Sequence, residues 1–467
     1  MIEGLKPYAE YKESGLPWLL AIPNHWQTVR NGSLFSQRNE TGYPQLPILE
    51  VSLRTGVRIR NFDESNRKQV MSDFSKYKRA AAGDIAYNMM RMWQGAVGVV
   101  PVDGLVSPAY VVARSFPKIH GVYYCAQFKM DLYLGEIDAV SRGIVKDRNR
   151  LYWDQFKQMR SLAPPPDEQA AIVRFLDHAN RKIDGFIRAK RKLIGLLNEQ
   201  KQAIIHRAVT RGLDPTVPLK PSGIPWLGDI PAHWEVRKIK SIVSIHGGMT
   251  PSKANALFWQ GSIPWVSPKN MKVREIHDAQ DHISNGALRQ TGIALIQPPA
   301  VLIVVRGMIL ARTFPTAITT VPVTVNQDMK ALVPQAGLSA EYFVSLLSGI
   351  KKDLLLLVEI AGHGTCCLRT DSWGNFTIPI PPLAEQLVIE QALKNKLTIQ
   401  NSAISRTERE IALMQEYRTR LTADIVTGKL DVREAAARLP DVLPTPDAND
   451  AAPEHDEAES DDDEVAV

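Results

Sequence analysis

Residues 223–234 read GIPWLGDIPAHW, and residues 15–26 read GLPWLLAIPNHW, at an offset of 208. A second phrase also occurs twice, because residues 164–169 read PPPDEQ and residues 381–386 read PPLAEQ, at an offset of 217. This period is much longer than the roughly 20 to 50 residues of solenoid and propeller repeats. The chain is therefore predicted to contain two homologous halves about a pseudo-twofold axis, which suits a ligand with two similar binding places.

Each half contains a block with helical periodicity, residues 164–213 and residues 381–432. Apolar side chains recur there in alternating steps of three and four, the seam pattern of a coiled coil. Polar residues interrupt both seams, and the simplest arrangement pairs the two helices with each other, antiparallel. The seam residues are Leu176, Ile183, Ile187, Ile194, Leu197, Ile204, Leu393, Leu397, Ile404, Ile411, Met414, Leu421 and Ile425.

Two mixed blocks, residues 27–163 and 234–380, contain short strand-like runs separated by Gly, Pro and Asn. These runs are residues 99–102 and 109–113 in the first block, and residues 301–305 and 319–325 in the second. The strand order is not predicted. The fold class is predicted as α+β, with two homologous α/β domains separated by two long antiparallel coiled-coil-like helices in a pseudo-twofold arrangement.

Three further segments complete the predicted organisation. Residues 1–26 complete the pseudo-repeat at the N-terminus. Residues 214–233 form a linker and the second copy of the opening phrase, and the prolines in the linker exclude a continued helix. Residues 433–467 are expected to be an acidic, disordered tail, because their final part has no aromatic side chain with which to form a core.

The net charge of +6 conceals a strong asymmetry. The segment from Asp441 to the C-terminus contains eleven Asp or Glu and no Lys or Arg. In residues 1–440, therefore, 56 Lys and Arg face 39 Asp and Glu, a net charge of +17. A chain with this charge is expected to bind a polyanion, and nucleic acid is the polyanion that the repeat favours.

The sequence also indicates what the chain lacks. Residues 1–12 have no apolar segment of a secretory signal, and the most apolar stretch, residues 293–311, is interrupted by polar residues and prolines. The three cysteines, Cys125, Cys366 and Cys367, form no metal-ligand spacing or disulfide framework, and His363 beside them adds no second ligand pair. No Walker A loop or methyltransferase motif is present. We expect no catalytic residue, no metal site and no membrane segment, and a cytoplasmic location.

The repeated phrases resemble those of specificity (S) subunits of type I restriction–modification systems. The resemblance covers most of residues 11–432 and has the order of that family: recognition domain, helix, recognition domain, helix. Residues 223–234 are similar to the motif that opens these domains, and residues 381–386 to a conserved motif at the start of the helix. Further similar stretches are residues 83–88, 91–96 and 107–110 in the first block, and residues 263–271 and 326–328 in the second.

The resemblance implies a non-catalytic, DNA-binding subunit. Each target-recognition domain would contact one half of an asymmetric, bipartite DNA site, and the helices would fix the gap between the halves. The helices would also bind two methyltransferase (M) subunits, and nuclease-motor (R) subunits would join the complex. S-adenosylmethionine, ATP and Mg would be bound by those partners, and this chain would hold no cofactor of its own.

Basic and amide side chains in the two mixed blocks are the candidates for DNA contacts. Arginine pairs with guanine and Gln or Asn with adenine, whereas isolated cations suit phosphates. The candidates are Arg54, Arg58, Arg60, Lys76, Lys78, Arg79, Arg91, Gln94, His246, Lys253, Lys269, Asn270, Lys272 and Arg274. For each of them, a solvated surface position is the alternative. The repeated Trp18, Trp26, Trp226 and Trp234 are expected to be structural, and Arg306 and Arg312 to flank an apolar run.

Two other functions compete with this one. A repeated coiled-coil scaffold could bind proteins and no DNA, although the positive charge outside the tail disfavours it. A self-sufficient DNA enzyme would require a catalytic constellation that the sequence does not show.

Overall fold

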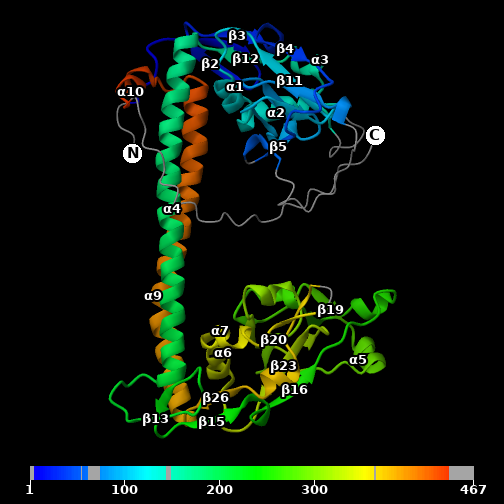
Figure 1. Cartoon of the computed structure of the whole chain (residues 1–467), viewed down its shortest axis with the longest axis vertical. Coiled ribbons are helices and arrows are strands. Elements are labelled where there is room, and N and C mark those ends of the chain that lie inside the picture. The colour runs from blue at the N-terminus through cyan, green and yellow to red at the C-terminus, as the bar shows by residue number, and fades with distance from the viewer. Residues whose placement is uncertain (1–4, 54, 61–73, 143–148, 362–363, 441–467) are drawn as a thin grey trace. The chain divides into compact units, whose positions relative to one another are not determined.

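The computed structural model describes residues 5–53, 55–60, 74–142, 149–361 and 364–440 (Figure 1). Arg54, His363 and the acidic segment 441–467 lie outside these described residues. The chain divides into two compact units. The first unit comprises residues 1–189 and 410–467, and the second comprises residues 190–409.

Two long helices supply part of each unit: α4 (Pro166–Arg211) and α9 (Leu383–Val426). Pro166 at the first position and the acids Asp167 and Glu168 in the first turn favour the start of α4. Both helices are followed by a glycine with positive φ, Gly212 at 73° and Gly428 at 76°. Only glycine adopts this left-handed conformation without strain, and it ends the helix there.

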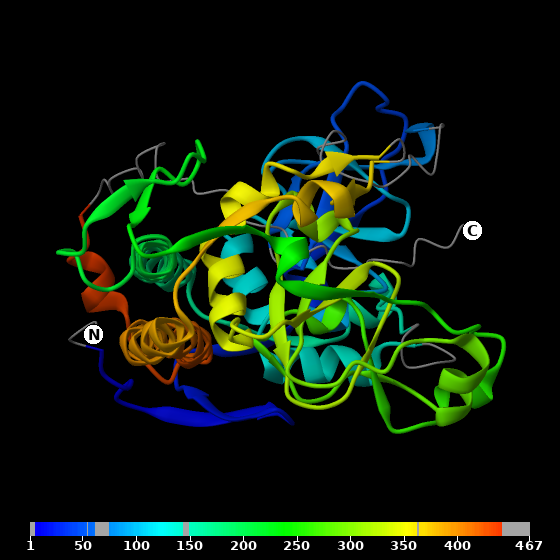
Figure 2. The ribbon, with the colours of Figure 1, turned by 90° about the horizontal axis from the view of Figure 1, so that it is seen from below.

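The two helices lie side by side and antiparallel within each unit (Figure 2). In the first unit, Arg418 of α9 donates to Asp184 of α4, and Leu421 and Ile425 pack in one core with Leu176. In the second unit, the Lys201 ammonium donates to the Asn401 side-chain oxygen at 2.7 Å. Farther along α4, Val209 shares a core with Leu393, which lies nearer the start of α9.

The predicted seam residues point inward along this helix pair. Seven of them are buried: Leu176, Ile183, Ile187, Leu393, Leu397, Leu421 and Ile425. The other six, Ile194, Leu197, Ile204, Ile404, Ile411 and Met414, are half-buried.

The first unit contains an antiparallel sheet in the order β4-β11-β8-β9. These strands are β4 (Phe35–Arg38), β8 (Ile85–Asn88), β9 (Val97–Val99) and β11 (Tyr110–Ser115). Two-stranded pairs surround it: β1 (Tyr11–Leu16) with β2 (Leu19–Pro23), β3 (Gln27–Arg30) with β12 (Arg160–Ala163), β5 (Leu49–Ser52) with β6 (Gly56–Ile59), and β7 (Lys78–Ala80) with β10 (Gly104–Val106). The helices are α1 (Gly121–Phe128), α2 (Asp131–Val140), α3 (Trp153–Phe156) and α10 (Arg433–Ala437). An aromatic core that includes Phe35, Tyr87 and Phe128 joins the sheet to α1.

The second unit contains a five-stranded sheet in the order β16-β23-β20-β21-β18. Its strands are β16 (Val243–Gly247), β18 (Glu275–Ile276), β20 (Val301–Val304), β21 (Thr316–Thr319) and β23 (Met329–Pro334). A second sheet has the order β19 (Asp281–Ile283), β17 (Ile263–Val266), β22 (Thr324–Val325). Two-stranded pairs are β13 (Leu219–Pro221) with β14 (Asp229–Pro231), β15 (Glu235–Lys238) with β26 (Thr377–Ile380), and β24 (Glu359–Ile360) with β25 (Cys366–Cys367). The helices are α5 (Asn285–Thr291), α6 (Ala340–Gly349), α7 (Lys351–Leu355) and α8 (Thr370–Gly374).

The two main sheets share one topology. The order β4-β11-β8-β9 matches β16-β23-β20-β21, with the strands taken in the same sequence along the chain. A helix pair follows the sheet in both units, α1 and α2 in the first and α6 and α7 in the second. The duplication found in the short phrases therefore extends through both mixed blocks.

Three details differ from the sequence-based expectations. The acidic tail was expected from residue 433, but residues 433–437 form α10, and Ala436 is buried in the first core. The run 319–325 was expected as one strand, but it divides between β21 and β22 because Pro322 cannot donate a hydrogen bond in a ladder. The run 99–102 contributes only Val99 to β9, and Pro101 follows.

Candidate nucleic-acid interface

A carboxylate near the start of each long helix, Glu168 or Glu385, holds the repeated opening phrase. In the first unit, the Trp26 indole N–H donates to Glu168 Oε1 at 3.0 Å, and His25 Nε2 lies 2.8 Å from Oε2. In the second unit, the Trp234 indole donates to Glu385 Oε2 at 3.1 Å, and His233 Nε2 lies 2.7 Å from it. In each unit, therefore, the opening phrase supplies the Trp and His, and the helix-start phrase supplies the Glu, of one contact that we call the joint.

The adjacent glutamine connects the same joint to the mixed block. Gln169 Oε1 accepts from the backbone N–H of His120, the residue before α1, at 3.1 Å. Gln386 Oε1 accepts from the backbone N–H of Ser339, the N-cap of α6, at 2.8 Å. Each mixed block is therefore fixed to its long helix through the Glu-Gln pair.

The repeated tryptophans are structural, as expected. Trp26 and Trp234 are fully buried. Trp18 packs edge-on against Tyr133, with ring centroids 5.5 Å apart, and Trp226 stacks on Phe376 at 5.1 Å. The buried rings of Trp26 and Trp234 are therefore not available to a base.

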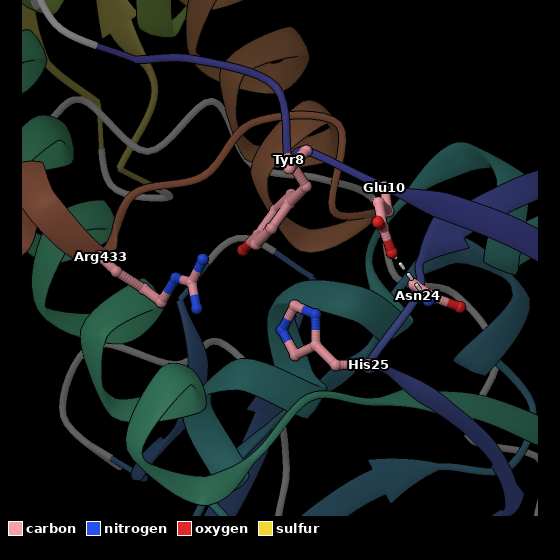
Figure 3. Close-up of a pocket in the computed structure, with 6 residues that line it drawn as sticks. Tyr8, Glu10, Asn24, His25 and Arg433 are labelled. Atoms are coloured by element: carbon pink, nitrogen blue, oxygen red, sulfur yellow. Dashed lines mark hydrogen bonds between the residues drawn. The ribbon is translucent and has the colours of Figure 1, made fainter.

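The N- and C-terminal segments meet at the joint of the first unit. The Tyr8 hydroxyl donates to Glu168, and the Arg433 guanidinium lies 5.3 Å from the centre of the Tyr8 ring. Burial, reinforced by the bond to Glu168, raises the pKa of Tyr8. A cavity of about 290 Å³ opens here between Tyr8, Asn24, His25 and Arg433 (Figure 3). Tyr8 and His25, which line this cavity, also contact Glu168 in the joint.

In the second unit, polar loops gather at one edge of the main sheet. The strands β16 and β20 run antiparallel to β23, and both Gly247 and Ile303 lie opposite Lys330. The segments 248–262 and 305–315, which follow these strands, therefore meet segment 326–328, which precedes β23. We call these three segments the second loop edge. The backbone N–H of Asn326 also donates to Val266 O at 3.0 Å, which brings the start of segment 267–274 to the same edge.

The second loop edge and its adjoining residues are strongly basic. Residues 246–255, 267–274, 305–315 and 326–330 contain seven Lys or Arg, and Asp328 is their one acid. The cations are Lys253, Lys269, Lys272, Arg274, Arg306, Arg312 and Lys330. Arg274 is paired with Glu390 of α9, and the concentration of the other six cations attracts polyanions.

The first unit has the topologically equivalent edge. Tyr110 at the start of β11 lies opposite Asn88 at the end of β8, and Val112 lies opposite Arg38 at the end of β4. The segments 39–47, 89–96 and 107–109 therefore share one edge, which we call the first loop edge. The stretches that resemble the specificity-subunit family, in both blocks, lie at or next to these two equivalent edges.

Several predicted contact residues have partners within the fold. The Lys78 ammonium donates to the carbonyls of Pro108 and Tyr110, both at 2.9 Å, and burial lowers its pKa. Arg79 pairs with Glu40 and Asp103, and Arg58 pairs with Glu50 at 2.6 Å. Arg60 and Arg91 are half-buried, and each interacts within the chain. These side chains stabilise the loop edge.

Two predicted contact residues of the second unit also have partners within the fold. Asn270 accepts from the backbone N–H of Ser267 at 2.9 Å. Arg274 bridges the mixed block to α9, since its guanidinium donates to Glu390 and to Ser345, both at 2.8 Å. His246 is half-buried on β16. Arg58 and Arg274 are exposed as well as ion-paired, and the other exposed candidates are Lys76 and Gln94 in the first unit, and Lys253, Lys269 and Lys272 in the second.

The structure also adds residues that the sequence pattern did not single out as contacts. Arg306 is exposed at the second loop edge, where its backbone N–H donates to Asp328 O at 3.2 Å, and Lys330 lies between Gly247 and Ile303. In the first unit, Arg142 and Arg150 pair across a short hairpin. These positions have no distinguishing sequence pattern, because they reach the loop edges only through strand pairing.

The glycine pair before the second loop edge offers a stability test. A Cβ on Gly248 would lie 1.9 Å from Asn326 O and 2.3 Å from Val325 O, both backbone atoms. A Cβ on Gly247 would meet only the flexible Lys330 ammonium, at 3.1 Å. Gly248→Ala is expected to lower the free energy of unfolding by about 1–3 kcal/mol because the backbone must shift. Gly247→Ala is the matched control, and equal losses in urea denaturation would show that this close approach is absent.

Within residues 5–53, 55–60, 74–142, 149–361 and 364–440, no helix is long and apolar enough to cross a membrane. Over the same ranges, no group of three or more His, Cys, Asp or Glu is arranged to hold a metal ion.

Comparison with known proteins identifies relatives of the chain. Residues 231–412 match the family model described as type I restriction modification DNA specificity domain. The chain is 29% identical over 273 residues to the type I restriction enzyme EcoR124I/EcoR124II specificity subunit of Escherichia coli, which covers 58% of this chain and 63% of that protein. It is 30% identical over 171 residues to the MjaIX specificity subunit of Methanocaldococcus jannaschii, covering 36% of this chain and 38% of that one. The matched regions thus span less than two thirds of either relative.

A solved structure has the same fold over most of the chain. It is a chain from work on the structural basis of complex assembly and conformational transition of the type I R-M system. The TM-score is 0.64 at 15% identity, and the match covers 87% of this chain and 99% of that one. The chain thus has the fold of this structure over most of its length, and its residues 231–412 match a type I restriction modification DNA specificity domain.

Proposed function

We propose that this chain is the sequence-specific DNA-binding subunit of a type I restriction–modification complex, with one half-site of a bipartite target bound at each loop edge. The observation that carries the proposal is the equivalence of the two edges. The same strand order delivers loops to the same edge of both sheets, and seven cations lie at or beside the second edge, of which Arg274 is paired with Glu390. Phosphate contacts would supply affinity, and base contacts from the loops would supply specificity.

The two edges differ in chemistry, which suits an asymmetric target. In the first unit, Arg58 is paired with Glu50, and Arg79 with Glu40 and Asp103, whereas the second edge and its adjoining residues carry exposed lysines. Two modules can bind one face of B-DNA when their centres lie about one helical turn, ~34–36 Å, apart. A helix of 46 residues such as α4 extends for about 70 Å, so it is long enough to set a gap of this size.

The long helices are the proposed binding surface for two methyltransferase subunits. Large apolar side chains are exposed on both helices: Phe186, Leu193 and Leu196 on α4, and Leu387, Val388, Ile399 and Leu413 on α9. Exposed apolar residues on otherwise polar helices are costly unless a partner covers them. Because the chain is duplicated, each half would bind one such subunit.

Catalysis is assigned to the partners. In this proposal the chain itself is non-catalytic and binds no cofactor. The methyltransferase subunits bind S-adenosylmethionine, and nuclease-motor subunits bind ATP and Mg. The complex acts on DNA in the cytoplasm.

A mobility-shift assay with the full chain tests the DNA-binding part of the proposal. At low salt, duplexes of mixed sequence should be retained, and retention should fall steeply as salt increases. A protein-binding coiled-coil scaffold, the competing function, would retain no duplex. Methyl transfer by the purified chain without added subunits would instead support a self-sufficient enzyme and contradict the proposal.

A further inference from the structure

Two arginines of the first unit face each other across a hairpin. The backbone N–H of Arg142 donates to Arg150 O at 3.1 Å, and that of Arg150 donates to Arg142 O at 2.9 Å. Residues that exchange both bonds in an antiparallel pair have their side chains on the same face, with Cα atoms about 5.5 Å apart. Neither guanidinium has a hydrogen-bond or ion-pair partner among the described residues. Two like charges directly opposite each other are destabilising.

This hairpin belongs to the first loop edge. The backbone N–H of Leu151, the residue after Arg150, donates to Met89 O at 2.9 Å, at the start of segment 89–96. Segment 89–96 also contacts the helix that leads into the hairpin, because a Cβ on Gly95 would lie 3.9 Å from Leu134 of α2. The arginine pair is therefore placed beside the loop that carries the predicted contact residues Arg91 and Gln94.

The Asp138 carboxylate of α2 accepts from the Asn149 amide at 3.0 Å and forms no ion pair with either arginine. Among the described residues, which do not include 143–148, the like-charged pair therefore has no counter-ion.

The equivalent hairpin of the second unit has a different composition. There the backbone N–H of Leu368 donates to Val305 O at 2.8 Å, as Leu151 does to Met89. The facing residues are Glu359 and Cys367, and Glu359 is 4.0 Å from the Arg369 guanidinium. The fold alone does not require two cations at these positions, so the arginine pair is particular to the first edge.

We propose that Arg142 and Arg150 clamp a DNA phosphate at the first loop edge. The proposal rests on the DNA-binding function proposed above and assigns it a contact. A phosphate between the two guanidinium groups would convert their repulsion into two charge-assisted interactions, for which the planar donor fork of arginine is well suited. Because it contacts the backbone, the clamp would supply affinity and position without selecting a base.

The test uses the full chain and a fluorescein-labelled duplex of mixed sequence. The double variant Arg142→Gln/Arg150→Gln should bind about tenfold more weakly near 0.1 M salt, and the slope of log affinity against log salt should decrease by about 0.9, the loss of one phosphate contact. The variant Arg142→Lys/Arg150→Lys keeps both charges and should keep the slope. The melting temperature of the Gln variant should be unchanged or higher, because a repulsion has been removed.

A second cross-strand arginine pair supplies the matched control. Arg30 of β3 lies opposite Arg160 of β12, and both are exposed. Arg30 precedes β4, whose first residue Phe35 is at the end of the strand away from the first loop edge. Arg30→Gln/Arg160→Gln removes the same charge and should leave the salt slope unchanged.

The outcomes separate the clamp from the general function. If the wild-type chain binds DNA and the 142/150 Gln variant has the wild-type slope, the clamp is wrong. The clamp is also wrong if the salt slope of the 30/160 variant decreases as much, because the effect would then be one of net charge. It is wrong as well if the 142/150 Gln variant melts at a lower temperature, because the arginines would then support the fold. If the wild-type chain binds no duplex, the proposed function fails instead.

Discussion

Replacing Trp26 by alanine is expected to lower the free energy of unfolding of the first unit by about 3–5 kcal/mol. The ring is fully buried, 5.9 Å from the Tyr8 ring, and a Cβ on Gly428 would lie 3.1 Å from it. Its loss leaves a cavity where the N-terminal segment, α4 and the end of α9 meet. It also removes the indole donor of Glu168, a carboxylate that is only 3% exposed.

Trp234→Ala is the matched variant in the second unit. Trp234 is also fully buried, so the loss of packing is comparable. Its partner Glu385, however, has a side chain that is 29% exposed, so water can replace the lost donor. Because the buried Glu168 carboxylate loses its indole donor, Trp26→Ala should lower the free energy of unfolding by about 1–3 kcal/mol more than Trp234→Ala does. Urea unfolding of both variants tests this, and a larger loss for Trp234→Ala would contradict the joint as described.

Inserting one heptad into both long helices is expected to lengthen the gap in the DNA target and to leave both half-motifs unchanged. The insertion points are after Ala189 in α4 and after Arg409 in α9, where the two compact units divide, so the contacts within each unit are preserved. Seven residues add about 10 Å of helix, which corresponds to at most about 3 base pairs of B-DNA. Mapping methylated adenines in cells that co-express the methyltransferase subunits measures the gap.

A heptad in α4 alone is the control for this insertion. It disrupts the pairing of the seam with α9 and should abolish methylation, because one half of the helix pair no longer matches the other. An altered half-motif with an unchanged gap would contradict the assignment of the gap to the helices.

Much of the fold could be predicted because it is encoded locally and twice. The heptad steps placed Leu176 and Leu393 on the helix seam, and both are buried. The recurring phrases marked the joint, although the bond between Trp26 and Glu168 joins residues 142 positions apart and could not be inferred from spacing. The strand order was not predictable, because it depends on pairings between distant segments.

The candidate site was less predictable, because charge in a sequence does not show which cations are already neutralised. Arg79 and Arg274 had the pattern of contact residues, yet both have carboxylate partners in the fold. Arg142 had no pattern, and strand pairing with Arg150 brings it to the loop edge. The DNA contacts of the individual residues are predictions, and binding assays with single variants test them.

The most direct test of the central claim is a map of methylated adenines produced when the wild-type chain is co-expressed with its methyltransferase subunits. Two loop edges on a duplicated framework predict methylation within a split motif, two different half-motifs separated by a gap of fixed length. A single uninterrupted motif, or methylation that does not depend on this chain, would contradict the account.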